Sequence, residues 1–171
     1  MPRSLADGHT KFTILTEKPA DPKKPTVTEL AAGIDASCRI LQSDFVWSAT
    51  DSDTVDEKAL CVTGNAQSLG ASNWEGNITP FRYFDGTGKA DATEDAVFAA
   101  IKDKGTELWC YARETSKLST DPWAADDEIF LGGNVTTDTP KKPESTGYIK
   151  RPTRLLFQEG YDNIKAYATT P

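Results

Sequence analysis

The side chains that most often carry chemistry are few and scattered in this chain of 171 residues. His9 is the only histidine, and it lies close to the N-terminus, where little would orient its ring. Ser-His-Asp or Cys-His catalysis would have to use it, and a zinc site built on several histidines is excluded by the count. We therefore predict no catalytic residue and no enzyme activity.

The three cysteines, Cys38, Cys61 and Cys110, lie far apart and form no C-x-x-C pair. An odd number at this spacing is typical neither of a disulfide framework nor of a zinc site. We expect all three to be small, buried apolar side chains in a reducing compartment.

Acidic residues gather in a run from Asp44 to Glu57 that contains no Lys or Arg. If the run were an EF-hand loop starting at Asp51, three required positions would hold unsuitable residues: Val55, Asp56 and Val62. We expect a solvated acidic face, no metal and no other cofactor. A weaker, irregular Ca²⁺ site stays open, and so does a carboxylate pair for glycoside hydrolysis, because the separation of such a pair depends on the fold.

Charge is distributed unevenly along the chain. The 19 Lys and Arg residues stand against 26 Asp and Glu residues, a net charge of −7, which argues against a protein that holds a polyanion. The segment 141–154 is nevertheless basic, with five Lys and Arg residues against Glu144, a local charge of +4. We expect this segment to face an acidic surface of another copy rather than nucleic acid.

Apolar residues alternate with polar ones through most of the chain, which predicts strands. The expected strands are 11–15, 39–50, 54–63, 78–84, 108–113, 128–135, 148–158 and 164–168. Gly132 and Gly133 indicate a bulge or a close backbone approach within one of them. The segment from Asp91 to Lys104 instead has helical spacing, with a capping pattern at Asp91 and Glu94. We predict a mainly β (α+β) fold, a β-sandwich or barrel-like domain with one flanking amphipathic helix and extended loops.

Two proline-rich segments, 16–30 and 138–147, are predicted to be exposed loops. The expected organisation is an N-terminal arm at 1–10 followed by one domain at 11–171. No secretory signal follows Met1, and the longest apolar run, from Ala96 to Ile101, is far too short to span a bilayer. We expect a soluble protein made in the cytosol, with no membrane partner.

Five stretches of the sequence together carry a resemblance to a known family: DGHTKFTILTEKPADP (7–22), TELAAGIDASCRIL (28–41), WSATDSDTVDEKALC (47–61), EDAVFAAIKDKGTELWCYAR (94–113) and DEIFLGGNVTTDTP (127–140). The chain resembles the major tail tube proteins of bacteriophages with long non-contractile tails, the siphovirus type. The resemblance extends over nearly the whole chain. It brings no catalytic residues with it.

The resemblance implies a structural virion protein with a β-sandwich tail tube fold. In such proteins, six copies form a ring, and rings stack through loops and terminal arms into a tube. The tube surrounds a tape measure protein and later conducts the DNA genome during ejection, without binding it specifically. The implied partners are further copies of this chain, the tape measure protein and other tail proteins, assembled in the host cytoplasm.

An acidic channel wall would let DNA pass, since carboxylates do not displace its counterions. The channel-facing candidates are Asp51, Asp53, Asp56 and Glu57, with Asp126, Asp127 and Glu128 as the second choice. The candidates for contacts between subunits are His9, Pro22, Lys23, Lys24, Lys141, Lys142, Arg151 and Arg154. We also expect residues 1–10, 16–30 and 138–147 to be mobile in the monomer and to become ordered on assembly.

The main alternative is a ligand-binding β-sandwich module, either carbohydrate-binding or capsid-decorating. Its binding platform would be exposed tryptophans among Trp47, Trp74, Trp109 and Trp123. An enzyme with two carboxylates in a cleft is the third possibility.

Overall fold

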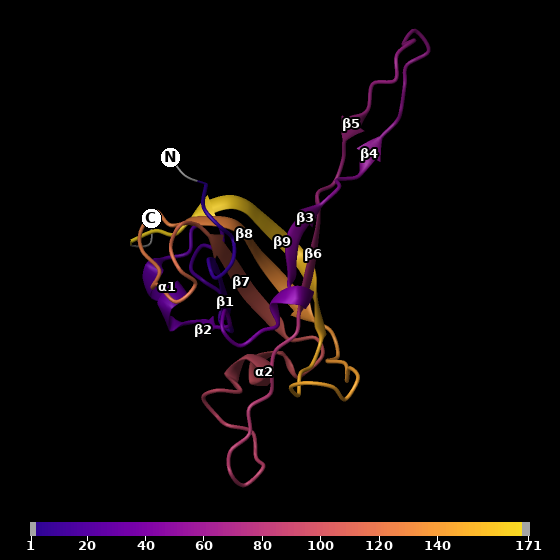
Figure 1. Ribbon diagram of the computed structural model, residues 1–171. Helices are drawn as coiled ribbons and strands as arrows, with labels where there is room; N and C mark the ends of the chain where they lie inside the picture. Colours follow the sequence, from indigo (N-terminus) through magenta and orange to yellow (C-terminus); the bar gives the residue numbers. More distant parts are fainter. Residues whose placement is uncertain (1–2, 169–171) are drawn as a thin grey trace.

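A seven-stranded antiparallel sheet forms the body of the protein in the computed structural model, which describes residues 3–168 (Figure 1). From edge to edge its strands are β2 (Ile34–Asp35), β1 (Thr10–Leu15), β7 (Glu107–Glu114), β8 (Glu128–Thr137), β9 (Thr153–Lys165), β6 (Asn73–Ile78) and β3 (Val46–Thr50). A separate two-stranded hairpin pairs β4 (Thr54–Val55) with β5 (Ser68–Leu69). The predicted mainly β fold is confirmed.

Strand β7 is buried on both of its faces. Leu108, Cys110 and Ala112 belong to one hydrophobic cluster, while Trp109 and Tyr111 belong to a second. This division follows from the alternation of side chains along a strand. A sheet that is apolar on both faces needs cover on both sides, and the rest of the chain supplies it.

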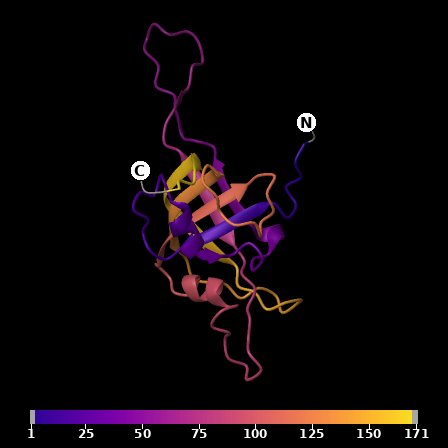
Figure 2. The same cartoon turned by 90° about the vertical axis from the view of Figure 1, so that its left-hand side faces the viewer.

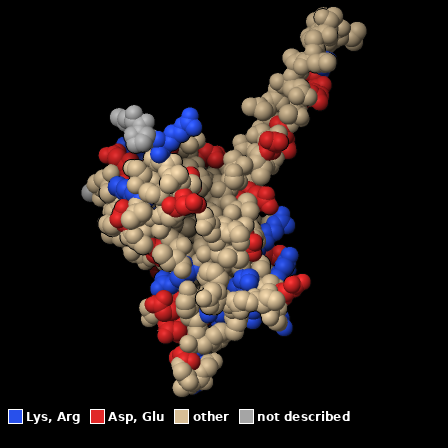
Figure 3. All heavy atoms as spheres, in the orientation of Figure 1, with Lys and Arg blue, Asp and Glu red and all other residues tan. Residues whose placement is uncertain are grey.

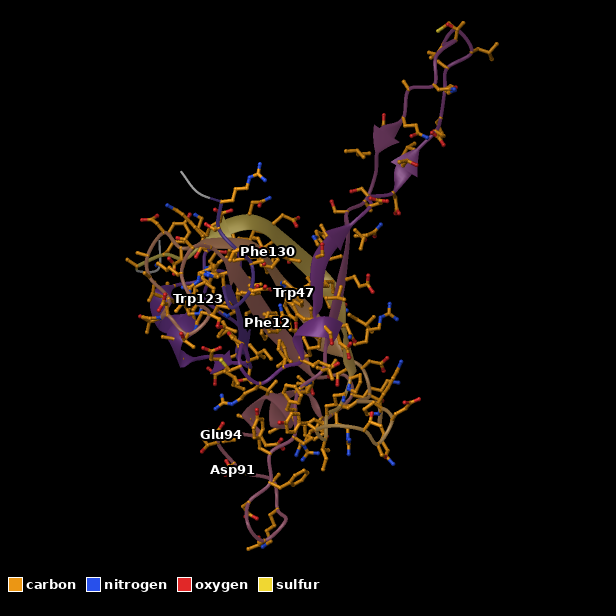
Figure 4. All side chains as sticks on the ribbon, in the orientation of Figure 1. Phe12, Trp47, Asp91, Glu94, Trp123 and Phe130 are labelled. Atoms are coloured by element: carbon orange, nitrogen blue, oxygen red, sulfur yellow. The ribbon has the colours of Figure 1, made fainter. Side chains whose placement is uncertain are left out.

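The first cluster is enclosed because the sheet curls over itself. Trp47 of β3 packs edge-on against Phe12 of β1, with ring centroids 5.1 Å apart, as the labelled side chains in Figure 4 illustrate. The indole Nε1 of Trp47 also donates a 2.9 Å hydrogen bond to the carbonyl oxygen of Leu131 in β8. The two parts of the sheet thus pack face to face in a sandwich-like arrangement.

The second cluster lies on the opposite face and is covered by α1 (Val27–Ala32) and the loop around Trp123. Leu30 of α1 is buried there. The helix begins with a capping box in which Thr26 and Glu29 each accept a hydrogen bond from the other's backbone N–H. The expectation that all of 16–30 is an exposed loop is therefore wrong at its C-terminal end. The T-x-x-E pattern of Thr26 and Glu29 was the sequence signal for this helix.

Helix α2 spans Ala96–Ile101 and is shorter than the predicted helix from Asp91 to Lys104. Asp91 accepts hydrogen bonds from the N–H groups of Thr93 and Glu94, but these close a turn that precedes the helix. The buried carboxylate of Asp95 then binds Arg82 and the Tyr83 N–H. This inward turn of Asp95 places the helix start at Ala96.

Several strands have bounds that differ from the predicted ones. Parts of the segments expected at 148–158 and 164–168 join in one long strand, β9, which spans only Thr153–Lys165. Its register against β8 shifts between Asn134 and Val135. In 39–50 only β3 is a strand, and it follows a short 3₁₀ turn, η1 (Gln42–Asp44). The strands expected at 54–63 and 78–84 reduce to β4 and to isolated bridges.

The predicted close approach at Gly132 and Gly133 is confirmed. A Cβ atom on Gly133 would lie 2.3 Å from the Phe157 ring, and one on Gly132 would lie 2.6 Å from the Tyr111 ring. Only glycine therefore lets β8 pass between these two aromatic side chains.

Candidate functional site

Residues 51–72, called here the arm, project from the body between β3 and β6 (Figures 1 and 2). Its root is braced by a 2.9 Å hydrogen bond from the Asp53 N–H to the Ala71 carbonyl, and by a 3.0 Å bond from Asn73 Nδ2 to Asp53 Oδ1. Beyond this root, four apolar side chains are exposed: Val55, Leu60, Val62 and Leu69. A two-stranded hairpin with such side chains is marginal alone in water, so the arm is suited to binding another surface.

The first set of channel-facing candidates lies on this arm. Asp51 and Asp53 occupy its root, Asp56 and Glu57 follow β4, and all four are exposed. Acidic side chains are visible along the arm in Figure 3. Their place relative to a channel stays a prediction, because it depends on how copies assemble.

The second set is split between surface and interior. Asp127 is 7% exposed and binds Arg113 Nη1 at 2.7 Å, while Lys117 contacts its other oxygen. Burial raises the pKa of Asp127, but hydrogen bonds from Lys117, the Ala124 N–H and Arg113 outweigh it and lower that pKa below its usual value. Asp127 thus binds inside its own subunit, whereas Asp126 and Glu128 are exposed.

Of the four N-terminal candidates for subunit contacts, His9 and Pro22 are hydrogen-bonded to the body. His9 Nδ1 is 3.0 Å from the Lys117 carbonyl oxygen, and the Pro22 carbonyl accepts a 2.8 Å hydrogen bond from Tyr111 OH. Lys23 lies 3.6 Å from Glu159, and both Lys23 and Lys24 are exposed. The ring of His9 is therefore oriented after all, although by a backbone carbonyl and not by a catalytic partner. Met1 and Pro2 of the expected arm at 1–10 lie outside the described residues.

The remaining candidates lie at the end of the molecule opposite the arm, in residues 141–154, called here the basic loop. Two backbone hydrogen bonds hold it, from the Lys141 N–H to the Pro152 carbonyl and from the Arg151 N–H to the Pro80 carbonyl. The side chains of Lys141, Lys142 and Arg154 are exposed. Blue side chains gather at this lower end in Figure 3, away from the acidic arm.

A hollow of about 590 Å³ lies beside the basic loop and was not predicted from the sequence. Its walls come from three segments of the chain and consist of Cys38, Phe81, Arg82, Tyr83, Tyr148 and Ile149. Phe81 and Tyr148 pack edge-on with centroids 5.9 Å apart, and the Arg82 N–H binds the Ile149 carbonyl at 2.8 Å. The run of aromatic residues at 81–84 was the signal, but it predicted a strand instead.

The outward face of β3, β6, the first part of β9 and the last part of β8 is mostly polar and lies beyond the cover of the second cluster; it is called here the polar face. Three cross-strand pairs lie on this face: Ser48 of β3 opposite Glu75 of β6, Asn77 of β6 opposite Arg154 of β9, and Thr136 of β8 opposite Leu156 of β9. Their neighbours Trp47, Ile78, Leu155 and Val135 point into the first hydrophobic cluster. Because side chains alternate, the two sets lie on opposite faces.

The cysteines differ from expectation. Cys38 and Cys61 are exposed, and only Cys110 is buried, where burial raises the pKa of its thiol. Within residues 3–168, no group of three or more His, Cys, Asp or Glu side chains is arranged to hold a metal ion.

None of the helices in the described part of the chain has the length and apolar character needed to cross a membrane. A protein-family model described as "Phage tail tube protein" matches residues 1–170. A search of curated proteins finds no match.

Proposed function

Because this chain belongs to the phage tail tube protein family, a family of structural virion components, we propose that its copies close into rings and that the rings stack into the tube of a siphovirus-type tail. We propose six copies per ring, as the sequence resemblance implies. The partners are then other copies of the chain, the tape measure protein and other tail proteins, and assembly takes place in the host cytoplasm. The polar face carries this proposal, because it is a broad strand surface without cover that ends in a projecting arm.

Ring closure would use the open edge of the sheet. Strand β3 is the terminal strand of the seven, and its inner neighbour is β6. An edge strand presents unpaired N–H and C=O groups, which pairing between copies would satisfy. A repeated contact of this heterologous kind closes into a ring when the rotation between copies allows it.

We propose that the polar face lines the channel. Its exposed groups include hydroxyls, amides and both signs of charge, such as Glu75 and Arg154. Such a wall displaces few counterions from DNA, so the genome would slide without being held. The arm continues β3 and β6 beyond the body, which would place Asp51 and Asp53 at the channel where two rings meet. Their repulsion of DNA acts only within about 8–10 Å at physiological salt.

We expected residues 1–10, 16–30 and 138–147 to become ordered on assembly, and this set now changes. Gly8 and His9 are already hydrogen-bonded to the loop at 117–119. In 16–30, the part that includes α1 is docked on the body through Leu30. We keep residues 138–147 from the expected set and add the arm, whose residues are nearly all exposed in one copy. We propose that these two segments become fixed by neighbouring copies.

The alternative of a ligand-binding module required exposed tryptophans as its binding platform. Trp47, Trp109 and Trp123 are buried, and Trp74 is half-buried against Phe157. A sugar or a capsid surface would therefore meet no cluster of exposed tryptophans in the described residues.

Negative-stain electron microscopy of the purified protein tests the proposal. At high concentration, over a range of salt concentrations, we expect rings and tubes of constant width. Protein that stays monomeric under all these conditions would contradict it.

A further inference from the structure

The tip of the arm exposes a large apolar side chain to water. Leu60 is 109% exposed at the turn of the arm, and Val62 beside it is also exposed. The turn is nevertheless shaped, by a 3.0 Å hydrogen bond from the Val62 N–H to the Ala59 carbonyl and a 2.6 Å bond from Lys58 Nζ to Asn65 Oδ1. Together with Val55 and Leu69, these side chains give the arm an exposed apolar surface, which is typical of a site of protein–protein contact.

The hollow beside the basic loop has the complementary character. Tyr148 and Ile149 in its wall are exposed, at 81% and 53%, and Phe81 forms another part of its wall. Its volume of about 590 Å³ is ample for one or two aliphatic side chains. The hollow therefore offers an apolar site that no part of residues 3–168 of its own chain fills.

The charges near the arm tip and near the hollow are also complementary. Asp56, Glu57 and Lys58 precede Leu60 on the arm and leave one net negative charge there. Arg82 lies in the wall of the hollow, and Lys150 and Arg151 directly follow the wall residue Ile149. Opposite charges around an apolar centre select the register of a contact and speed its formation.

The positions of the arm and the hollow determine whether they can bind within one copy or only between copies. The arm and the hollow lie at opposite ends of the molecule (Figure 1), so an arm cannot reach the hollow of its own copy. A contact between two different surfaces of identical copies is head-to-tail, and it repeats without closing when copies are stacked.

On the basis of the proposed tube function, we propose that the arm tip of one copy, centred on Leu60, docks into the hollow formed by Phe81, Tyr148 and Ile149 of a copy in the adjacent ring. The occupant of the hollow is thus a second copy of this chain. This contact joins ring to ring and is separate from the strand pairing that closes each ring.

Two native cysteines report directly on this docking. Cys61 directly follows Leu60 at the arm tip, Cys38 lines the hollow, and both are exposed. Docking would bring the thiol of one copy close to that of the next. Cys110 is buried and serves as an internal control that does not react.

The experiment treats assembled tubes with a short bis-maleimide and identifies the joined peptides by mass spectrometry. We expect a link between Cys61 and Cys38 of different chains, which is lost in Cys61→Ser and in Cys38→Ser tubes. In parallel, Leu60→Asp is expected to reduce tube formation at least tenfold while the monomer stays folded. The matched change Thr63→Asp, which adds the same charge on the same turn, should leave tubes intact.

Wild-type tubes without the Cys61–Cys38 link, or Leu60→Asp protein that forms normal tubes, would overturn the docking and leave the tube function standing. Wild-type protein that never forms rings or tubes would overturn the proposed function, and the docking with it.

Discussion

Trp47 and Leu131 are 84 residues apart in the sequence, and a single hydrogen bond joins them across the core, from the indole Nε1 to the carbonyl oxygen at 2.9 Å. The bond ties β3, the strand from which the arm departs, to the centre of the sheet. The position of the arm relative to the body therefore depends on a buried contact and not only on the neighbouring strand β6.

Replacing Trp47 with Phe should destabilise the subunit. The change removes the hydrogen bond and some packing against Phe12 and Phe157, so we expect a loss of about 1–3 kcal/mol in the free energy of unfolding. Urea unfolding of the monomer measures it. Trp74→Phe is the control, because the Trp74 indole also packs on Phe157 but donates its hydrogen bond to the exposed Asp162 carboxylate. It should cost less than Trp47→Phe, and equal losses in the two variants would argue against the role of the Trp47 hydrogen bond.

Gly133→Ala tests the close approach between β8 and Phe157. The new methyl group would lie 2.3 Å from the ring, so the ring or the strand must move, at a cost of about 1–3 kcal/mol. Thermal unfolding monitored by circular dichroism gives the change. Gly64→Ala on the arm meets nothing within 4 Å and should leave the melting temperature unchanged; a Gly133→Ala protein as stable as the wild type would show that β8 has free space there.

The pair of Asp127 and Arg113 predicts a loss of stability in acid. The pKa of Asp127 is lower in the folded state than in the unfolded state, where it is about 3.9, so its contribution is complete above that pH. The contribution is lost as the pH falls from about 4 through the folded pKa, because the unfolded chain binds the proton more readily.

In Asp127→Asn protein, the acid dependence of the unfolding free energy below pH 4 should be weaker. The same change should cost about 3–5 kcal/mol at pH 7, because Arg113 stays buried without its counterion. Denaturant unfolding at several pH values measures both effects. The exposed neighbour change Asp126→Asn should cost far less, and an Asp127→Asn protein with wild-type acid dependence would contradict the assignment.

A variant with a shortened arm should fold normally but fail to assemble into tubes. Residues 56–67 can be replaced by Asn-Gly, since Val55 and Ser68 already face each other in the β4–β5 pair and Asn-Gly suits a two-residue hairpin turn. The unfolding free energy should change by less than about 0.5 kcal/mol, while electron microscopy should find no tubes. Normal tubes from this variant would show that stacking does not need the arm tip.

The parts of this fold that were predictable from sequence are those fixed by local pattern. The alternation of apolar and polar residues predicted β1 and β7, and the helical spacing of apolar residues predicted the buried face of α2 with Val97 and Ile101. The bounds of α2 were wrong because Asp95 binds Arg82 across the fold, a contact that no local pattern contains. Helix α1 was missed because its capping box, Thr26 and Glu29, lies directly after a proline-rich segment that predicts a loop.

The candidate surfaces were less predictable, because they depend on which segments meet. The sequence pointed to the acidic run and to the basic segment, and these lie at opposite ends of the molecule. The hollow joins three segments, at 38, 81–83 and 148–149, of which the first and last are more than a hundred residues apart, so its residues could not be grouped from the sequence. Asp127 looked like a surface acid and is buried because its partner Arg113 comes from the adjacent strand.

A cryo-electron microscopy structure of the assembled tube would test the proposed channel lining most directly. We expect the polar face, with Glu75, Asn77 and Arg154, to line the channel, and Asp51 and Asp53 to reach it at the junction between rings. A tube in which that face lies on the outer surface, with another part of the sheet around the channel, would contradict it.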